Sequence, residues 1–154
     1  MITKLTLEHA LRVARNMRES DRREVMATRW NDNSEEFALE CYRVSGVSWV
    51  AINKDGEPVV MGGFAFNSPG VATAWMVGTD KWLSVALEVS RFSKKSIRTL
   101  FSGNDIHRVQ AFSALFHVES HRWLKVIGLT PEHLLPKWGK DEDDFILFEA
   151  LKGS

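Results

Sequence analysis

The sequence predicts a single α+β domain in which helices are layered on a mixed, mostly antiparallel sheet. Three observations predict it. An amphipathic helical region precedes three β-rich segments that are separated by tight turns. Helix and strand patterns then alternate to the end of the chain. The length, 154 residues, is that of one domain spanning residues 1–154.

The first elements are a short strand and a helix. Ile2–Thr6 alternates apolar and polar residues, as a strand does. Leu7–Met17 carries apolar residues three and four positions apart, which predicts a helix. Glu19–Asp21 interrupts that spacing, so we expect the helix to have ended there.

A second helix is expected directly after this break. Asp21 is followed three residues later by Glu24, and this spacing resembles a capping box. It predicts a helix that begins at Asp21 and runs toward Thr28.

A third helix is expected over Glu35–Val44, capped by Asn33 or Ser34 and ended at Ser45. It carries the single cysteine, Cys41. One cysteine cannot form an internal disulfide, which fits a reducing compartment. We interpret Cys41 as a small buried hydrophobe rather than a nucleophile.

The strongest strand signal is an antiparallel meander. Val47–Asn53 and Pro58–Phe66 flank a turn with Asp55-Gly56 at its centre, and Val71–Thr79 follows a second turn. Gly62-Gly63 lies in the middle strand, where it indicates a bulge or a close approach of another group to the backbone.

The second half of the chain alternates helix and strand. A long helix is expected over Leu83–Phe101 and a strand over Ile106–Ser113. The next helix ends at Gly128, because glycine suits the left-handed position after a helix. Leu129–Trp138 and Phe145–Leu151 read as two final strands.

Four ordered motifs resemble the GNAT N-acyltransferases. They are DRREV at 21–25, KDGEPVVMGG at 54–63, AWMVGTD at 74–80 and SHRWLKVIG at 120–128. The chain resembles most a phage branch of this family, which includes internal virion protein A of short-tailed coliphages and phage acetyltransferase-like proteins. The resemblance implies the GNAT fold over nearly the whole chain.

The resemblance also implies a site. In the family, the strand matching 72–79 splays from its neighbour, and its backbone receives the pantetheine arm of acetyl-CoA. That assigns cofactor contacts to Met76, Val77, Gly78 and Thr79, with Lys81 as a cation for the phosphates. The segment 79–86 lacks the glycines with which family members bind pyrophosphate, so we interpret it as a degenerate phosphate loop.

Two positions of the family's chemistry are also replaced. His117 stands where members carry asparagine, and Leu124 stands where many carry a tyrosine general acid. His117 is then the best-placed titratable group for acid–base catalysis, and a solvated histidine that caps the helix is the alternative interpretation. We expect the functional surface at the mouth between the strands ending at Thr79 and spanning Ile106–Ser113. Plugging tryptophans (Trp75, Trp82 or Trp123) would exclude coenzyme A.

Two functions from different classes follow. One is an acetyl-CoA-dependent N-acyltransferase that acts on a small-molecule amine or a protein amino group. The other is a non-catalytic GNAT-like phage protein that acts in virion assembly or host interaction, with phage or host proteins as partners. The expected location is cytoplasmic (the host cytoplasm for a phage-encoded chain) or the virion.

Composition argues against other classes. Twenty basic and twenty acidic residues cancel, so no global field attracts nucleic acid, and no stretch has the roughly 20 apolar residues of a membrane span. His117 and His121 lack the further ligands that zinc needs, so no metal is expected. The basic stripe Arg91, Lys94, Lys95 and Arg98 is interpreted as a solvated face, with an anionic partner as the alternative.

Overall fold

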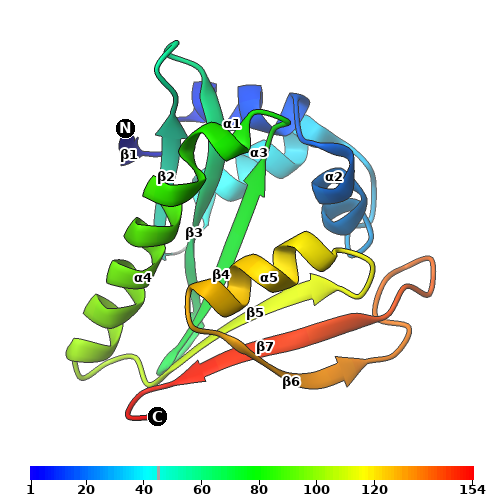
Figure 1. The fold of residues 1–154 in the computed structure, drawn as a ribbon. Coiled ribbons are helices and arrows are strands. Elements are labelled where there is room, and N and C mark those ends of the chain that lie inside the picture. Colours follow the sequence, from blue (N-terminus) through cyan, green and yellow to red (C-terminus); the bar gives the residue numbers. More distant parts are fainter. Residues whose placement is uncertain (45) are drawn as a thin grey trace.

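The computed structural model describes residues 1–44 and 46–154 and confirms the α+β fold class. Seven strands form one sheet in the order β1-β2-β3-β4-β5-β7-β6 (Figure 1). All neighbouring strands are antiparallel except β4 and β5, which are parallel. The expected helix end at Ser45 lies outside the described residues.

The strands are β1 (Ile2–Lys4), β2 (Gly46–Ile52), β3 (Pro58–Ser68), β4 (Val71–Gly78), β5 (Arg108–Ala114), β6 (Thr130–Leu135) and β7 (Phe145–Leu151). The helices are α1 (Leu7–Arg15), α2 (Glu19–Met26), α3 (Ser34–Arg43), the 3-10 turn η1 (Trp82–Val85), α4 (Ala86–Ser102) and α5 (Val118–Val126).

The helices cover the two faces of the sheet in two groups (Figure 1). On one face, α1 and α3 bury a core against the meander, with Val13, Ala38 and Met61 almost completely enclosed. On the other face, α4 and α5 pack on the sheet through residues such as Ile97 and Leu124. The apolar spacing of each helix therefore marks the side that faces the sheet.

The boundary between α1 and α2 differs from the prediction. Thr6 caps α1 by accepting a hydrogen bond from the His9 amide at 3.2 Å, and the helix ends before Met17. Met17 instead forms an isolated bridge to Thr79. The next helix already begins at Glu19, so the prediction that Asp21 caps it was wrong.

Later boundaries agree more closely. Asn33 caps α3 by accepting hydrogen bonds from two backbone amides, as predicted. Gly128 adopts the left-handed conformation with φ of 106° just after α5. The long helix starts later than expected, because Trp82–Val85 forms the 3-10 turn η1. The strand β6 stops at Leu135 and leaves Trp138 in the connection to β7.

Gly62 and Gly63 permit a close approach and do not form a bulge. A Cβ on Gly62 would lie 2.7 Å from the ring of Trp49 and from the Trp75 carbonyl oxygen. A Cβ on Gly63 would lie 2.1 Å from the carbonyl oxygen of Val47. Any side chain here would push the neighbouring strand or tryptophan away.

The parallel pair β4–β5 separates along its length. Val71, Ala72 and Thr73 pair with Arg108–Gln110, and the pairing ends there. Beyond Thr73, β4 keeps its antiparallel partner β3 up to Gly78. The two central strands therefore diverge in front of α2 and the start of α5.

Candidate functional site

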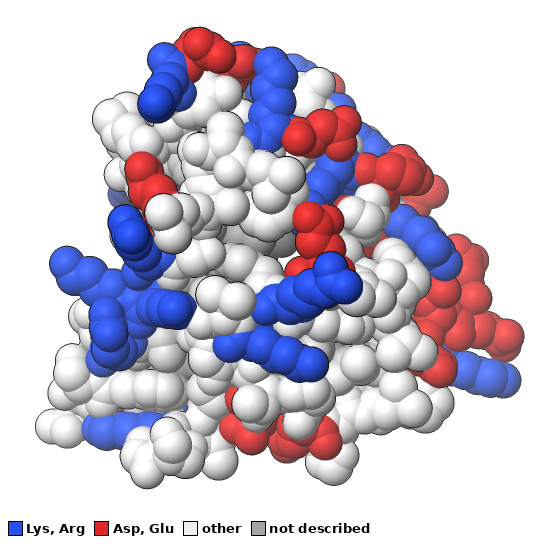
Figure 2. Space-filling view, in the orientation of Figure 1, with Lys and Arg blue, Asp and Glu red and all other residues white. Residues whose placement is uncertain are grey.

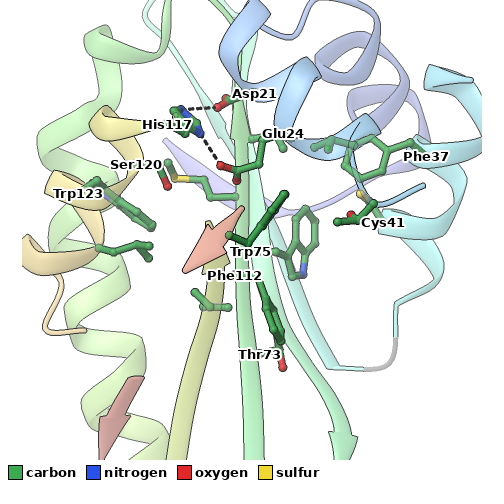
Figure 3. Close-up of a pocket in the computed structure, with 18 of the residues that line it drawn as sticks. Asp21, Glu24, Phe37, Cys41, Thr73, Trp75, Phe112, His117, Ser120 and Trp123 are labelled. Carbon is green, nitrogen blue, oxygen red and sulfur yellow. Dashed lines mark hydrogen bonds and ion pairs between the residues drawn. The ribbon is translucent and has the colours of Figure 1, made fainter. Parts of the chain in front are cut away.

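A cavity of about 520 Å³ opens where β4 and β5 diverge (Figure 3). This volume lies within the usual range of ligand pockets, roughly 300–1,000 Å³. Its walls come from β4, β5, α2, α3, η1 and α5, together with Trp138 of the β6–β7 connection. It lies at the mouth where the sequence analysis predicted a functional surface.

The cavity reaches both faces of the sheet. Trp75 belongs to the core under α1 and α3, whereas Met76 packs with the core under α4. Both residues line the cavity, together with Phe37 from α3 and Trp123 from α5. The gap between the strands is therefore a passage through the sheet. Trp75, Trp82 and Trp123 form its walls and do not fill it.

Backbone groups of β4 differ in their availability. The Thr79 amide donates to the Val59 carbonyl on β3 at 2.9 Å, so alternate residues Val77 and Trp75 also face β3. Gly78 and Met76 face the opposite side, toward the gap. At Gly78 both groups bond to α2, because its amide donates to Asp21 and its carbonyl accepts from the Arg18 amide. Met76 thus presents its amide and carbonyl to the cavity.

Three amides of the turn before α4 donate to acceptors within the turn. The Lys81 amide donates to Thr79 Oγ1, the Trp82 amide to the Thr79 carbonyl, and the Ser84 amide to the Lys81 carbonyl. These are the positions from which a glycine loop would donate to a phosphate.

The side chain of Lys81 is also engaged. Its Nζ lies 3.0 and 2.9 Å from the two carboxylate oxygens of Glu57. The hydrogen bond from Lys81 lowers the pKa of Glu57. Lys81 therefore has a partner within the chain at the place where the sequence analysis expected it to contact phosphate.

A buried polar cluster joins α2 to β4 and α5. Arg18 donates from Nε and Nη2 to the two oxygens of Asp21, at 3.0 and 3.1 Å, and from Nη1 to Glu119 at 2.9 Å. Asp21 also accepts from the Gly78 amide at 2.7 Å. Arg18 lies over the Trp82 ring, 4.7 Å from its centroid. Asp21 is 3% exposed. Its bond to the Gly78 amide joins α2 to β4.

His117 is enclosed by the same cluster. Its side chain is 4% exposed, its Nδ1 lies 2.7 Å from Glu24 Oε2, and its Nε2 lies 3.2 Å from Asp21 Oδ1 (Figure 3). Arg18 Nη2 lies 3.5 Å from Nε2. A carboxylate lies beside each ring nitrogen, so a charged ring donates to both Glu24 and Asp21. In a neutral ring with the proton on Nδ1, Nδ1–H donates to Glu24 and Nε2 accepts from Arg18.

Glu24 has one oxygen fixed and one available. Oε2 accepts from His117 Nδ1, from the Ala114 amide at 3.0 Å and from Ser113 Oγ at 3.3 Å. Within residues 1–44 and 46–154, no hydrogen bond involves Oε1, and the side chain is 19% exposed. Glu24 lines the cavity, so its free oxygen can accept a proton from a group bound there.

Aromatic rings surround the outer part of the cavity. Phe112 of β5 stacks on Trp138, with centroids 5.6 Å apart and planes 5° apart. Phe112 is 37% and Trp138 50% exposed. The Lys140 amide donates to the Ala27 carbonyl at 2.6 Å, which fastens the β6–β7 connection to the end of α2 and brings Trp138 to the cavity.

Two further sequence candidates are apolar in character. Cys41 is buried in the cavity wall, and burial raises the pKa of its thiol to about 12. Its thiol is therefore protonated at neutral pH and unreactive, as expected of a buried hydrophobe. Leu124, at the family's tyrosine position, is 4% exposed and cannot donate a proton.

The remaining candidates lie away from the cavity or form no site. His121 Nε2 bonds to the Ala114 carbonyl oxygen at 2.8 Å, and the described residues hold no group of three metal-ligating side chains. Arg91, Lys94, Lys95 and Arg98 are all exposed on α4, where Figure 2 shows basic side chains at the left. None of the described helices is long and apolar enough to cross a membrane.

Sequence reasoning missed the residues that give the cavity its charge and aromatic lining. Asp21 and Glu24 were interpreted as helix caps, although their spacing also places both carboxylates on one helix face. Phe112 alternates with buried neighbours on β5, which was the available signal for a second exposed face. Trp138 carried no local signal, because its position depends on how the β6–β7 connection folds over α2.

Solved structures show which fold this is. The chain matches a GNAT-family acetyltransferase from Bacillus anthracis with a TM-score of 0.74 and 16% identity, over 99% of this chain and 95% of that one. It matches ribosomal-protein-S5-alanine acetyltransferase from Vibrio fischeri with a TM-score of 0.69 and 13% identity, over 99% and 93%. It matches a variant of spermidine N-acetyltransferase from Vibrio cholerae with a TM-score of 0.65 and 11% identity, over 99% and 95%.

These likenesses establish the GNAT fold, and at such low identity they establish the fold alone. No protein-family model matches the sequence, and no curated protein sequence matches it significantly.

Proposed function

We propose that the protein is an acetyl-CoA-dependent N-acyltransferase acting on an amine. The observation that carries the proposal is the passage through the sheet, which presents the free backbone of Met76 and the free oxygen of Glu24 to one space. A thioester arm and an amine can enter such a passage from opposite faces. The GNAT fold supports this reading, because the three acetyltransferases above share it.

The residues fit one part of the coenzyme better than the other. Met76 offers an amide and a carbonyl, the groups with which an extended amide-containing arm pairs. The cavity volume of about 520 Å³ also accommodates such an arm. By contrast, the amides of Lys81, Trp82 and Ser84 and the side chain of Lys81 already have partners. We infer that Met76 holds the pantetheine arm.

The chain's own contribution to the chemistry is proton transfer. The coenzyme, when bound, supplies an acyl group activated as a thioester. An amine is protonated at neutral pH and must lose a proton before it can attack. Glu24 Oε1 accepts this proton, and Oε2 stays fixed by the Ala114 amide and His117.

His117 then acts as a positioning residue. Both ring nitrogens lie within the cluster, so the ring orients Glu24 and does not itself meet the substrate. This replaces the direct acid–base role that the sequence suggested for His117. The predicted contacts of Val77, Gly78 and Thr79 with the coenzyme are not part of this proposal, because their backbone groups face β3 or α2.

A non-catalytic role is the second candidate, and one observation favours it. The Lys81, Trp82 and Ser84 amides before α4 bond within their own turn and are not available to a phosphate, as in a protein that keeps the fold without the coenzyme. The phage role in virion assembly or host interaction rests on the sequence motifs and stays a prediction.

Two measurements separate the candidates. Calorimetry with acetyl-CoA should give a dissociation constant in the micromolar range, about −8 kcal/mol. Release of free thiol from acetyl-CoA should depend on an added amine and fall roughly 10²–10⁴-fold in Glu24→Gln. Glu19→Gln, an exposed change on the same helix, is the matched control. No heat at millimolar acetyl-CoA would overturn the proposal in favour of the non-catalytic role.

A further inference from the structure

The side of the cavity facing α2 and α3 has a distinctive chemistry. Four carboxylates line the cavity (Asp21, Glu24, Glu40 and Glu119) against two guanidinium groups (Arg18 and Arg29). Arg18 pairs with Asp21 and Glu119, and Arg29 pairs with Glu40. Glu24 is the one lining carboxylate without a Lys or Arg partner among the described residues.

We propose that this side of the cavity selects a primary monoamine carried on an aromatic ring. The proposal rests on the acyltransferase function above and names its acceptor. The ammonium would lie at Glu24 Oε1, and the ring would lie against Phe112, Trp138 and Trp75. Each part follows from a separate feature of the walls.

The charged side chains of the walls favour one positive group on the acceptor. A carboxylate that is fixed on one oxygen and free on the other attracts one cation. A second ammonium, as in a polyamine, would meet only carboxylates that are already paired with arginine: Glu40 with Arg29, and Asp21 and Glu119 with a shared Arg18. A carboxylate on the acceptor would face Glu24, which has no Lys or Arg partner among the described residues, while Arg18 and Arg29 are each already paired with carboxylates. The site therefore discriminates against polyamines and amino acids.

The aromatic side chains of the walls favour an aromatic ring as the body of the acceptor. Phe112 and Trp138 form a flat, parallel stack that is about half covered, and Trp75 lies on the opposite strand of the gap. An aromatic ring packs on such faces with offset or edge contacts. Both aromatic and aliphatic amines can place their ammonium near these faces, so the additional contacts of the ring distinguish the aromatic amine.

Binding can be tested without acetyl-CoA, using the indole N–H resonances of the full-length protein. Phenethylamine should shift the resonances of Trp75 and Trp138 and leave Trp30 unchanged, since Trp30 is fully exposed and outside the cavity. Butylamine lacks the ring, spermidine lacks the ring and adds charges, and 3-phenylpropionate keeps the ring but reverses the charge. Each should bind at least about fivefold more weakly than phenethylamine.

Variants separate the two parts of the site. Glu24→Gln should weaken phenethylamine binding about tenfold or more, and Phe112→Ala or Trp138→Ala about fivefold. Trp30→Ala and Glu19→Gln are the matched controls and should bind as the wild type does. Phe112 and Trp138 are exposed enough for their variants to fold, so they keep the test valid if Glu24→Gln does not fold.

The outcomes distinguish this inference from the proposed function. Spermidine or 3-phenylpropionate binding as tightly as phenethylamine would overturn the aromatic monoamine assignment. So would the absence of any amine-induced shift in a protein that binds acetyl-CoA. Amine binding with the predicted selectivity, in a protein that shows no heat with acetyl-CoA, would support the amine site and refute acyl transfer.

Discussion

Removing the Asp21 carboxylate should destabilise the protein more than any change of an exposed charge. In Asp21→Ala, the Arg18 guanidinium keeps Glu119 as its one remaining carboxylate among the described residues, and the Gly78 amide loses its partner. Breaking a buried ion pair costs about 3–5 kcal/mol, and an unmet buried amide costs about 1–3 kcal/mol. Because Glu119 offsets part of this loss, we expect about 4 kcal/mol in total.

Urea unfolding measures this loss. With a slope of about 2 kcal/mol per molar urea, the midpoint should fall by about 2 M. Asp21→Asn keeps an acceptor for the Gly78 amide and should lose about half as much. Asp32→Ala removes one partner of the exposed ion pair with Lys140 and should change stability by less than about 0.5 kcal/mol. A loss below about 1 kcal/mol in Asp21→Ala would refute the view that this carboxylate fastens α2 to β4.

Three further predictions concern buried or coupled residues. Trp82→Ala should lower the free energy of unfolding by about 3–5 kcal/mol without raising the affinity for coenzyme A, because Trp82 is a core residue and does not block the cavity. Tighter coenzyme binding in calorimetry would contradict this. Cys41 should react with iodoacetamide at pH 8 only as fast as the protein unfolds, since its thiol has a pKa of about 12; fast labelling of the folded protein would oppose this. The hydrogen bond from Arg29 lowers the pKa of Glu40, so its stabilisation should be present above the ordinary value of 4.5 and disappear as the pH falls through the folded-state pKa. Acid titrations of stability should therefore be flatter in Glu40→Gln below pH 4.5.

The features of the fold that the sequence predicted correctly are those that depend on nearby residues. Asn33 caps a helix through amides two and three positions away, and Gly128 ends one through its own backbone freedom. The glycines at 62 and 63 marked a close approach without revealing that Trp49 and the Val47 carbonyl fill the space. Such features are visible in a sequence because backbone conformation is mainly a local property.

The candidate site depended on contacts across the chain. Asp21 bonds to Gly78, 57 positions away, and Glu24 bonds to His117, 93 positions away. From the local sequence, these carboxylates were predicted to form a capping box. In the structure they bond instead to residues far along the chain. His117 was found from its place before α5, but its burial between two carboxylates follows only from how α2 docks on the sheet.

The most direct test is amide hydrogen exchange along β4 with and without acetyl-CoA. The Met76 amide faces the gap, whereas the Val77 and Thr79 amides are placed toward β3 and serve as internal controls. If the gap receives the coenzyme's arm, exchange at Met76 should slow on adding acetyl-CoA while exchange at Val77 and Thr79 stays the same. Unchanged exchange at Met76 under saturating acetyl-CoA would contradict the proposed site.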